Sequence, residues 1–361
     1  YPAYATPILG GFDAEPLTYN GELLDLALDL GNRLLPAFRT RHGLPYHRVN
    51  LKYGVPKGET KDTCLAAAGT LILEFGVLSR LSGVASFETA ARKAIRALWS
   101  RRSQSHGLLG SNINIETGAW TQSHSSVGAG SDSFYEYVLK AYVLFGDPEF
   151  LDMFEKMYGA LEEHLSHGPW KIEVDMNKGK AKKRSHYVSS LGAFWPALQV
   201  LAGDLEHAEA SHGAYHSIWK QFKAMPEIFD LANQKTINFG KDWPLRPELV
   251  ESSYHLYVAT RDPHYLHVAE EIMRTLQNIS RVECGFAAIA DVNTHRLDDR
   301  MDSYFFAETL KYLWLIFDEA SRHPPEIGSV LSSSSSLRRN ATRATNARIA
   351  ASAEYQKNGD K

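Results

Sequence analysis

Apolar positions recur along most of this chain with the spacing of amphipathic helices, in which one face is apolar and the other is polar. The pattern predicts helical segments near residues 21–38, 64–82, 86–102, 132–145, 148–165, 188–202, 205–223, 246–260, 263–280 and 302–319. Most of the chain is therefore expected to be helical, and the expected fold class is all-α.

Short turns separate these helices into pairs and return at a regular interval. The turns are centred on Gly83, Gly146, Gly203 and Arg261, which lie 63, 57 and 58 positions apart. A period of this length with two helices in each unit predicts a repeat of helical hairpins. The first helix of each pair is the more apolar, so an inner and an outer layer are expected. The period does not distinguish an open solenoid from a closed toroid.

Between the helix pairs lie short runs in which apolar and polar residues alternate, bounded by glycine, as in β-hairpins. These runs are residues 45–55, 109–120, 170–175 and 285–292, and they are expected at one rim of the helical layers. After residue 320 the chain becomes serine-rich and then basic, which predicts a disordered tail over residues 321–361. The expected organisation is one helical domain over residues 1–320 followed by this tail.

Composition narrows the class of protein. The chain has 361 residues, and 44% of them are hydrophobic, which is enough to bury a large core. The chain has a formal net charge of −3 and so lacks the strong positive field of nucleic-acid binding proteins. No nucleic-acid partner is therefore expected. The sequence shows neither an uninterrupted apolar stretch of about 18 residues nor a signal-peptide pattern, so no transmembrane segment is expected. The start at Tyr1 indicates a processed or partial product.

The cysteines and sequons say little about the compartment. Cys64 and Cys284 fit either two reduced core thiols or one disulfide, and composition slightly favours the thiols. The sequons at Asn278 and Asn340 are used only in the secretory pathway, and each is short enough to occur by chance. They are weak support for a luminal location.

Acidic residues interrupt three of the most apolar helices. Glu74, Glu136 and Glu308 each stand among apolar or aromatic neighbours. Burying an unpaired carboxylate costs on the order of several kcal/mol, so these residues predict an inner wall that faces a polar cavity. The alternatives are a solvated helix face, or pairing with a buried arginine such as Arg80 or Arg300.

Two acidic pairs also lie at helix starts. Asp132 and Glu136 are spaced i,i+4, and Glu248 and Glu251 are spaced i,i+3, so each pair shares one helix face. Interaction with the helix dipole, worth under about 1 kcal/mol, explains the first residue of each pair, but it does not explain the carboxylates inside apolar helices. Glycoside hydrolysis uses such a set, because one carboxyl group protonates the leaving oxygen while another activates water or attacks the sugar. The neighbouring aromatic residues, for which core packing is the simpler explanation and sugar stacking the other, are Trp195, Trp243, Tyr304 and Phe305.

Five sequence motifs run through the segments that carry these carboxylates. They are Leu73-Glu74-Phe75 with Leu81-Ser82-Gly83; Asp132-Ser133-Phe134-Tyr135-Glu136-Tyr137; Pro226-Glu227; Leu245-Arg246-Pro247-Glu248 with Val250-Glu251-Ser252; and Asp302-Ser303-Tyr304-Phe305 with Ala307-Glu308-Thr309-Leu310. With these motifs the chain resembles the class I α-1,2-mannosidases, glycoside hydrolase family 47. The stretches that begin Asn20-Gly21-Glu22, Pro45-Tyr46-His47 and Glu283-Cys284-Gly285 resemble the subgroup of ER degradation-enhancing α-mannosidase-like proteins.

This resemblance implies an (α/α)7 barrel, a toroid of helical hairpins, closed by a β-hairpin. It implies hydrolysis of terminal α-1,2-linked mannose from N-glycans of misfolded glycoproteins, by inversion, feeding ER-associated degradation. The implied location is the lumen of the endoplasmic reticulum, and the implied partners are high-mannose N-glycans and ER oxidoreductases.

The resemblance also implies roles for individual residues. Asp132, Glu227 and Glu248 match catalytic carboxylates, with Glu248 as the base and Glu227 as the acid. Calcium would sit at the barrel floor and hold hydroxyl groups of the sugar. The other matched residues would line the sugar pocket or orient water around calcium: Glu74, Glu136, Arg246, Glu251, Tyr304 and Glu308.

Two family motifs have no counterpart here. A Phe-Glu-x-x-Ile-Arg motif with another catalytic glutamate would precede the segment at residues 20–38. A closing Thr-Glu-x-His motif, whose threonine binds calcium, is replaced by Asp318-Glu319-Ala320-Ser321. Calcium takes about six to eight oxygen ligands, so no metal ligand is assigned in this chain. The barrel is expected to be incomplete at both ends.

Two alternatives to the hydrolase remain from the sequence. A mannose-glycan lectin of the same fold, with little turnover, is favoured by the two missing motifs. A helical-repeat scaffold that binds proteins in a groove is disfavoured by the carboxylates. Cys64 and Cys284 match cysteine positions of the subgroup, so we hypothesise a disulfide between them in the oxidising lumen.

Overall fold

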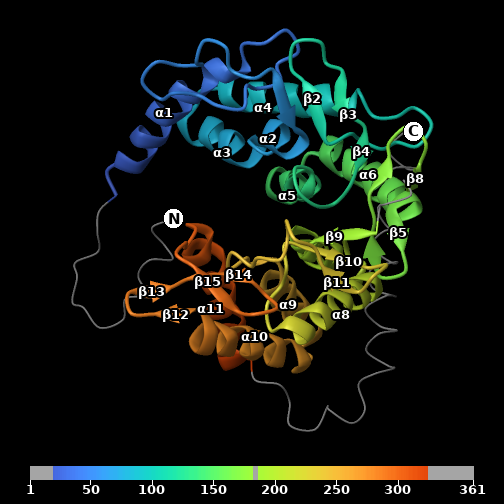
Figure 1. Ribbon diagram of the computed structural model, residues 1–361. Helices are drawn as coiled ribbons and strands as arrows, with labels where there is room; N and C mark the ends of the chain where they lie inside the picture. The colour runs from blue at the N-terminus through green and yellow to red at the C-terminus, as the bar shows by residue number, and fades with distance from the viewer. Residues whose placement is uncertain (1–18, 182–185, 324–361) are drawn as a thin grey trace, which may run out of the picture. The chain divides into compact units, whose positions relative to one another are not determined.

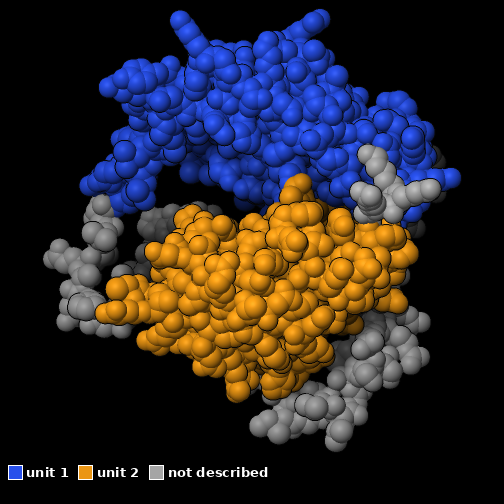
Figure 2. All heavy atoms as spheres, in the orientation of Figure 1, with its two compact units in different colours: residues 1–126, 130–165, 173–183 blue, residues 127–129, 166–172, 184–361 orange. Residues whose placement is uncertain are grey.

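The computed structural model describes residues 19–181 and 186–323 of the chain (Figure 1). These residues form two compact units (Figure 2). Of the described chain, unit 1 comprises residues 19–126, 130–165 and 173–181, and unit 2 comprises residues 127–129, 166–172 and 186–323. Each unit has its own helices, short strands and buried apolar residues.

Unit 1 is built from helical hairpins. Its helices are α1 (Glu22–Leu34), the 3-10 helix η2 (Leu35–Phe38), α2 (Leu65–Gly69), α3 (Ile72–Ser82), α4 (Ser86–Trp99), α5 (Asp132–Phe145) and α6 (Pro148–Leu165). Helix α3 packs against α4, and α5 packs against α6. The two pairs turn at glycines with positive φ, Gly83 at 76° and Gly146 at 71°. Glycine adopts this conformation without the steric cost of a Cβ atom, so it ends the first helix of each pair.

The apolar faces of these helices form the core of unit 1. On α4 the buried residues include Phe87, Ile95 and Leu98, which share one face of the helix. Helix α5 approaches α2 closely at Gly69, where a Cβ atom would lie 2.2 Å from the ring of Phe134. Glycine is therefore required at that position for the two helices to pack.

Unit 2 repeats the hairpin arrangement. Its helices are the 3-10 helix η3 (Ser190–Phe194), α7 (Trp195–Ala202), α8 (Leu205–Phe222), α9 (Glu248–Thr260), α10 (His264–Thr275), the π-helices η4 (Leu276–Ser280) and η5 (Phe305–Leu310), and α11 (Lys311–Arg322). The pair α7 and α8 turns at Gly203 with φ 85°, and the pair α9 and α10 turns at Arg261 with φ 59°. Arg261 thus takes the left-handed conformation of the glycines, at a steric cost that glycine does not have. The core includes Trp219 and Trp243, packed edge to face with ring centroids 5.1 Å apart.

Short antiparallel strands connect the helices in both units. In unit 1 one sheet contains β1 (Asp62–Cys64), β2 (Asn112–Asn114) and β3 (Trp120–Gln122), and another contains β4 (His124–Ser125), β7 (Val174–Asp175) and β8 (Lys180–Ala181). In unit 2 a sheet contains β9 (Tyr187–Ser189), β10 (Ile228–Asp230) and β11 (Lys235–Thr236). The two-stranded hairpins of unit 2 are β5 (Ser166–His167) with β6 (Trp170–Lys171), β12 (Arg281–Val282) with β13 (Gly285–Phe286), and β14 (Ala288–Asp291) with β15 (Arg296–Asp298).

The predicted helical segments are mostly helical in the structure, with local differences. Residues 188–189 belong to the strand β9, and residues 305–310 form the π-helix η5. The segment at residues 64–82 is divided, because α2 ends at Gly69 and α3 begins at Ile72. The hydroxyl of Thr70, which follows α2, donates to the Ala66 carbonyl at 2.9 Å. The segment at residues 263–280 ends in the π-helix η4. Helix α11 extends to Arg322, into the start of the expected tail. The rest of that tail, residues 324–361, lies outside the described residues.

The predicted β-hairpins are confirmed only in part. Residues 109–120 contribute β2 and the start of β3, which pair with each other. Residues 285–292 contribute β13 and β14, which pair with β12 and β15 and not with each other. Residues 170–175 contribute β6 and β7, which belong to different sheets. The hairpin predicted at residues 45–55 is wrong, because this segment holds only an isolated bridge between Asn50 and Gly54. There the Asn50 side chain accepts hydrogen bonds from the backbone N–H groups of Lys52 and Tyr53, at 2.9 and 3.0 Å, which makes a turn too tight for a strand pair.

One helical run among the described residues, Leu65–Ser82, is long and apolar enough to cross a membrane by length and composition, with a hydropathy of 1.4. The run spans α2 and α3 and includes Glu74 and Arg80. Its residues Leu65 and Ile72 are fully buried. A divided run with charged residues and a buried apolar face has the features of core helices in unit 1.

Candidate active site

An ion pair between Glu227 and Arg246 is the centre of the candidate site in unit 2. Arg246 Nε donates to Glu227 Oε1 at 2.6 Å, and Nη2 donates to Oε2 at 2.7 Å. The Arg246 side chain is 22% exposed and the Glu227 side chain 21%. Burial opposes the charge of Arg246, but hydrogen bonding and attraction from Glu227, helped by Glu248, raise the pKa of its guanidinium. Arg246 therefore stays charged, and the two-point contact fixes its plane.

The sheet β9–β10–β11 positions the Glu227 carboxylate. Ser190 directly follows β9 and Glu227 directly precedes β10, so the antiparallel pairing sets them opposite each other. Ser190 Oγ donates to Glu227 Oε1 at 2.9 Å, and the Ser190 N–H donates to the Glu227 carbonyl at 3.0 Å. The Glu227 N–H in turn donates to the carbonyl of Asp242 at 2.9 Å. Both the backbone and the side chain of Glu227 are thus held in place.

The residue before Arg246 has a strained backbone. Leu245 has a φ of 64°, a left-handed conformation that costs a residue with a Cβ atom on the order of 1 kcal/mol or more. Its side chain is fully buried, and Thr309 of η5 donates its hydroxyl to the Leu245 carbonyl at 2.7 Å. These contacts hold the bend that precedes Arg246 and the start of α9. Strain of this kind is concentrated at functional sites, where the surrounding structure maintains it.

Glu248 is the first residue of α9 and is half-buried. Burial raises the pKa of its carboxyl group to about 8. The like charges of Glu251 and Glu227 act in the same direction, whereas Arg246 and the backbone N–H of Glu248 lower the pKa. At neutral pH this carboxyl group is therefore mostly protonated. A carboxyl group with a pKa near the working pH can exchange a proton with a bound molecule, as acid–base catalysis requires.

Tyr304 connects Arg246 to a second ion pair. The Arg246 guanidinium lies 5.4 Å from the centroid of the Tyr304 ring, within the range of a cation–π contact. The Tyr304 hydroxyl contacts Asp302 Oδ2 at 2.7 Å and the Pro244 carbonyl at 3.0 Å, and Arg300 Nε donates to Asp302 at 3.0 Å. Burial and the hydrogen bond to Asp302 raise the pKa of Tyr304. The phenol is thus fixed as a hydrogen-bond donor beside the guanidinium.

Two more predicted site residues belong to unit 2. Glu251 lies on the turn of α9 that begins at Glu248, is 8% exposed, and accepts a hydrogen bond from the Tyr312 hydroxyl at 2.9 Å. Glu308 is half-buried in the π-helix η5, a helix type that is frequent at functional sites although rare elsewhere. The structure therefore brings five predicted residues of unit 2 together by contact or by charge, and places Glu308 beside Thr309 on η5. Those five are Glu227, Arg246, Glu248, Glu251 and Tyr304.

The remaining predicted site residues belong to unit 1. Glu74 of α3 is exposed and accepts a hydrogen bond from the Tyr137 hydroxyl of α5 at 2.8 Å. Glu136 of α5 is ion-paired with Lys140 one turn later. Asp132 begins α5 and accepts the backbone N–H of the next residue at 2.7 Å. Each of these carboxylates has a nearby partner on α3 or α5. A cavity shared with the carboxylates of unit 2 stays a prediction.

Arginine pairing and core packing are the alternative roles for the acidic and aromatic residues. Arg80 is hydrogen-bonded to Glu88, and Arg300 is hydrogen-bonded to Asp302. Their partners are thus not Glu74, Glu136 or Glu308, the carboxylates inside apolar helices. Core packing is confirmed for three of the four aromatic residues. Trp195 and Trp243 are each 1% exposed and Phe305 is 0% exposed, whereas Tyr304 is half-buried against Arg246.

Sequence reasoning assigned no role to three residues that shape the site. Ser190 bonds Glu227, and Leu245 holds the bend before Arg246. Asp242 has a carboxyl pKa that is raised by burial and by the charge of Glu227, against its own backbone N–H and two arginines. The position of Asp242 and Leu245 just before the Arg-Pro-Glu motif was an available signal. Ser190 gave none, because its role depends on strand pairing.

The described residues contain no group of three or more His, Cys, Asp or Glu side chains that could hold a metal ion. Cys64 lies in unit 1 and Cys284 in unit 2, and both are free thiols in the structure. Cys64 caps α2, with its Sγ accepting the Ala67 N–H at 3.4 Å. The disulfide between Cys64 and Cys284 therefore stays a prediction.

The sequence of this chain is similar to those of known proteins. The model of glycosyl hydrolase family 47 matches residues 7–332. The chain is 50% identical over 303 residues to alpha-mannosidase I MNS4 of Arabidopsis thaliana, covering 84% of this chain and 48% of that protein. It is 48% identical over 307 residues to human ER degradation-enhancing alpha-mannosidase-like protein 3, covering 83% of this chain and 32% of that protein. The chain thus spans about half the length of the plant relative and about a third of the length of the human one.

Comparison by structure gives the same family. An alpha-1,2-mannosidase from Trichoderma reesei matches with a TM-score of 0.74 and 25% sequence identity, over 83% of this chain and 70% of that one. This likeness confirms the expected fold class, which is the all-α (α/α)7 fold of helical hairpins with short strand hairpins. The family match and the relatives also confirm the resemblance drawn from the sequence motifs. The chain belongs to glycosyl hydrolase family 47.

Proposed function

We propose that this chain carries an α-mannosidase activity that removes terminal α-1,2-linked mannose from high-mannose N-glycans, with inversion. Its membership of the glycosyl hydrolase family and the names of its relatives support this proposal. The observation that carries it is Glu248, a carboxyl group with a pKa of about 8 beside the fixed pair of Glu227 and Arg246. A carboxyl group that exchanges a proton next to fixed hydrogen-bonding groups is what hydrolysis of a glycosidic bond requires.

The proposed setting is degradation of misfolded glycoproteins. Relatives with 42–50% identity include several named ER degradation-enhancing alpha-mannosidase-like proteins. We propose that this chain acts in the lumen of the endoplasmic reticulum on N-glycans of misfolded proteins. ER oxidoreductases as partners stay a prediction.

Glu248 is proposed as the base, the role that its motif implies. A pKa of about 8 leaves only a minor ionised fraction at pH 7, so a base at this position becomes more effective as the pH rises through about 8. An acid at the same position becomes less effective over the same range. A rate of mannose release that rises between pH 7 and 9 supports the base, and a falling rate assigns Glu248 as the acid.

Glu227 fits a positioning role better than the acid role expected from its motif. Both of its carboxylate oxygens accept hydrogen bonds from Arg246, and Oε1 also accepts from Ser190. Both carboxylate oxygens are therefore already engaged, and the two-point contact fixes the plane of the carboxylate. We propose that Glu227 fixes Arg246, that Arg246 donates hydrogen bonds to sugar hydroxyls, and that Tyr304 lines the sugar pocket.

The other motif residues complete the proposed site. Asp132 is proposed as a further catalytic carboxylate. Glu74, Glu136, Glu251 and Glu308 are proposed to accept hydrogen bonds from sugar hydroxyls or from water. These roles rest on the motif matches, on the half-buried position of Glu308, and on the partners that hold Glu74, Glu136 and Glu251 in place.

Calcium is implied by the family, but the described residues do not fit a calcium cage. They contain no cluster of three or more carboxylate, His or Cys side chains that could hold a metal. In the segment expected to carry the calcium threonine, α11 continues through Asp318 and Ser321, and the Ser321 hydroxyl donates to the Asp318 carbonyl at 2.8 Å. That hydroxyl is engaged within its own helix. No step of the proposed reaction is therefore assigned to calcium.

The proposal is tested by following mannose released from a high-mannose N-glycan by the purified chain. Glu248→Gln is expected to lower the rate at least about a hundredfold, because it removes the proton-exchanging group. Glu206→Gln on α8 is the matched control, since Glu206 is exposed and lies outside the site. Equal rates for both variants would contradict the proposal. Retention of the glycan without release would favour the lectin alternative.

A further inference from the structure

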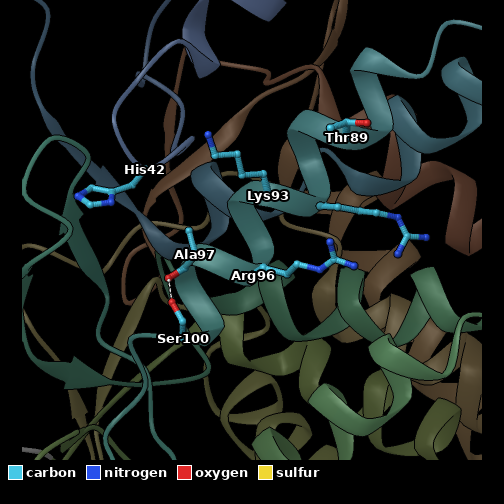
Figure 3. A pocket seen from close by; sticks show the side chains of 7 residues that line it. His42, Thr89, Lys93, Arg96, Ala97 and Ser100 are labelled. Carbon is cyan, nitrogen blue, oxygen red and sulfur yellow. Dashed lines mark hydrogen bonds between the residues drawn. The ribbon is translucent and has the colours of Figure 1, made fainter.

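The hollow along α4 in unit 1 is balanced in charge, and no ligand is assigned to it. It has a volume of about 460 Å³, and Figure 3 shows the side chains that line it. Arg92 donates to Asp147 at 2.6 Å, and Arg96 makes two hydrogen bonds of 2.6 Å to Glu149. The charge of each arginine is thus met by a carboxylate.

A buried hydroxyl group without a partner lies in unit 2, at the end of the π-helix η4. Ser280 is 0% exposed, and the described residues offer its Oγ no hydrogen bond. Its backbone carbonyl, by contrast, accepts the N–H of Ala287 at 2.8 Å. Burying a hydroxyl group without a hydrogen bond destabilises the folded state, whereas alanine would occupy nearly the same space without that penalty. The packing of unit 2 therefore gives no reason for a hydroxyl group at this position.

The sequence around Ser280 supplies a reason. Ser280 is the third residue of Asn278-Ile279-Ser280, which matches the acceptor pattern Asn-x-Ser for N-glycosylation. Transfer of a glycan to the asparagine requires serine or threonine at the third position. A chance match explains the pattern alone, but it does not explain a buried hydroxyl group that destabilises the fold.

The asparagine of this sequon is open to solvent. Asn278 is exposed on η4, which follows α10 and precedes β12 (Figure 1). Within the described residues its side-chain amide takes part in no hydrogen bond. Two other asparagines of unit 2 differ, because Nδ2 of Asn233 donates to Asp230 at 2.7 Å and Nδ2 of Asn293 donates to Thr236 at 3.0 Å. A sugar on Nδ2 of Asn278 would displace no hydrogen bond of the fold.

The surface around Asn278 leaves room for a large group. Arg274 and Gln277, on the turn before Asn278, are exposed, and so are residues 281–284 after the sequon. None of these residues belongs to the proposed active site. A bulky substituent on Asn278 is therefore compatible with the folded unit.

We propose that Asn278 carries an N-linked glycan and that the glycan is added before unit 2 folds. The proposal rests on the proposed location in the lumen of the endoplasmic reticulum, where a transferase uses a lipid-linked oligosaccharide as the donor. In the transfer, Nδ2 of Asn278 forms a bond to C1 of the first sugar, and the bond from C1 to the lipid diphosphate breaks. The diphosphate leaves with the electron pair, and Nδ2 loses one proton to a base of the transferase.

The burial of Ser280 sets the order of transfer and folding. The transferase recognises the hydroxyl group at the third position of the sequon, so this group has to be accessible during transfer. In the folded unit the Oγ atom of Ser280 is buried. Transfer to Asn278 thus fits the chain before η4 packs, and the folded chain without a glycan is expected to be a poor acceptor.

The site is tested by producing the chain behind a cleavable export signal in cultured mammalian cells. Asn340→Gln is included throughout, because it removes the sequon at Asn340. The decrease in mass after treatment with peptide N-glycosidase reports the glycan. Asn278→Gln and Ser280→Ala are expected to abolish this decrease, and Ser280→Thr is expected to keep it, since threonine also completes the sequon.

A second sequon provides the matched control. Glu22→Thr creates a sequon at Asn20, and both of these positions are exposed. A chain that is glycosylated at Asn20 but not at Asn278 would overturn the proposal. Because the signal supplies the location and the readout is a mass, such a failure leaves the proposed hydrolase untouched. Mannose release, measured separately, tests the hydrolase.

The order of events is tested with folded chain made in bacteria without a glycan. The chain with Glu22→Thr and Asn340→Gln is incubated with a purified transferase and a lipid-linked oligosaccharide. Transfer is expected at Asn20 and not at Asn278, because only Asn278 has its hydroxyl residue buried. Equal transfer to both would overturn the proposed order. Thermal unfolding of Ser280→Ala without a glycan is expected at no lower a temperature than the parent, and a lower midpoint would contradict the sequon as the reason for the hydroxyl group.

Discussion

The carboxylates of unit 2 and those of unit 1 differ in what surrounds them. In unit 2, Glu251 is 8% exposed and bonded to a phenol, and Glu227 is bound at both oxygens by a guanidinium. In unit 1, Glu74 is exposed, and Glu136, whose side chain is 18% exposed, is paired with a lysine one turn later in its own helix. Glu248, the third of these carboxylates in unit 2, has a strongly raised pKa.

This comparison shows that residue type alone does not decide how an inner-helix carboxylate behaves. Burial removes water, so the charge of a neighbour is felt more strongly and a carboxyl group without its own cation keeps its proton. Exposure leaves water to screen the same interaction. We therefore expect unit 2 to be the part of the chain in which substitutions change proton binding and stability most.

The largest expected effect is on the pH dependence of stability. The Glu248 pKa is about 8 in the folded chain against an ordinary value of 4.5, so the folded state binds more protons between these values. Its contribution is present below about pH 4.5 and is lost as the pH rises through about 8. Glu248→Gln should therefore gain stability relative to the parent by on the order of 4 kcal/mol between pH 4.5 and 9. Urea unfolding of both proteins across this range measures the difference, and parallel curves would contradict it.

The next largest effect is expected for Arg246→Met. It leaves Glu227 without its guanidinium in a largely buried place, which should lower the free energy of unfolding by about 2 to 3 kcal/mol. It should also raise the pKa of Glu248 further, because Arg246 lowers that pKa. Lys156→Met removes an ion pair of unit 1 in which both side chains are 59% exposed, and is expected to cost under about 1 kcal/mol. Urea unfolding at pH 7 compares the two; equal losses would remove the contrast between the units.

A smaller effect is expected from removing one phenol hydroxyl in each unit. Tyr312→Phe removes the hydrogen bond that the Tyr312 hydroxyl donates to the buried Glu251, which should lower the free energy of unfolding by about 1.5 to 2 kcal/mol. Tyr137→Phe removes the hydrogen bond donated to the exposed Glu74. Water replaces that bond, so the free energy of unfolding should fall by under about 1 kcal/mol. Thermal unfolding of the two variants under identical conditions gives the comparison. The reverse order would show that the partner of Glu74 matters more than burial does.

The smallest effect is expected at the hairpin turns. Gly146→Ala puts a Cβ atom on a residue with φ 71° and should cost about 1 kcal/mol, since open space around it leaves only the backbone strain. Arg261→Gly removes the same strain in unit 2 but also loses the ion pair with Glu319 at 2.6 Å. Its net effect is expected within about 0.5 kcal/mol of zero. A large loss in Arg261→Gly would mean that the Glu319 pair is needed to hold α9 against α11.

Most of the helical architecture could be predicted from the sequence, because it depends on local patterns. Amphipathic spacing gave the helices, and the residues Gly83, Gly146, Gly203 and Arg261 gave the turns, all of which have positive φ. The strand prediction at residues 45–55 failed because alternation of apolar and polar residues also fits a tight turn around Asn50. The break in the helix after Gly69 and the π-helices η4 and η5 have no clear periodic signal.

The residue types of the candidate site could be predicted from the sequence, but the hydrogen bonds between its residues could not. The motifs named Glu227, Arg246 and Glu248, and the structure places these three together. The motifs did not predict that Arg246 binds Glu227 at two points, nor that Ser190 and Asp242 take part. Such contacts join residues far apart in the chain, and the sequence pattern near each residue does not report them.

The sequence by itself determined the helical hairpins, the turn positions and the presence of acidic residues on apolar helices, since each follows from the order of neighbouring residues. Only the tertiary structure decided that burial raises the pKa of the Glu248 carboxyl group. The proton on Glu248 depends on how much water the packing of unit 2 removes, and on the distance to Arg246, Glu227 and Glu251. Electrostatic energies depend on distance and on the surrounding medium, and both are set only when distant segments come together.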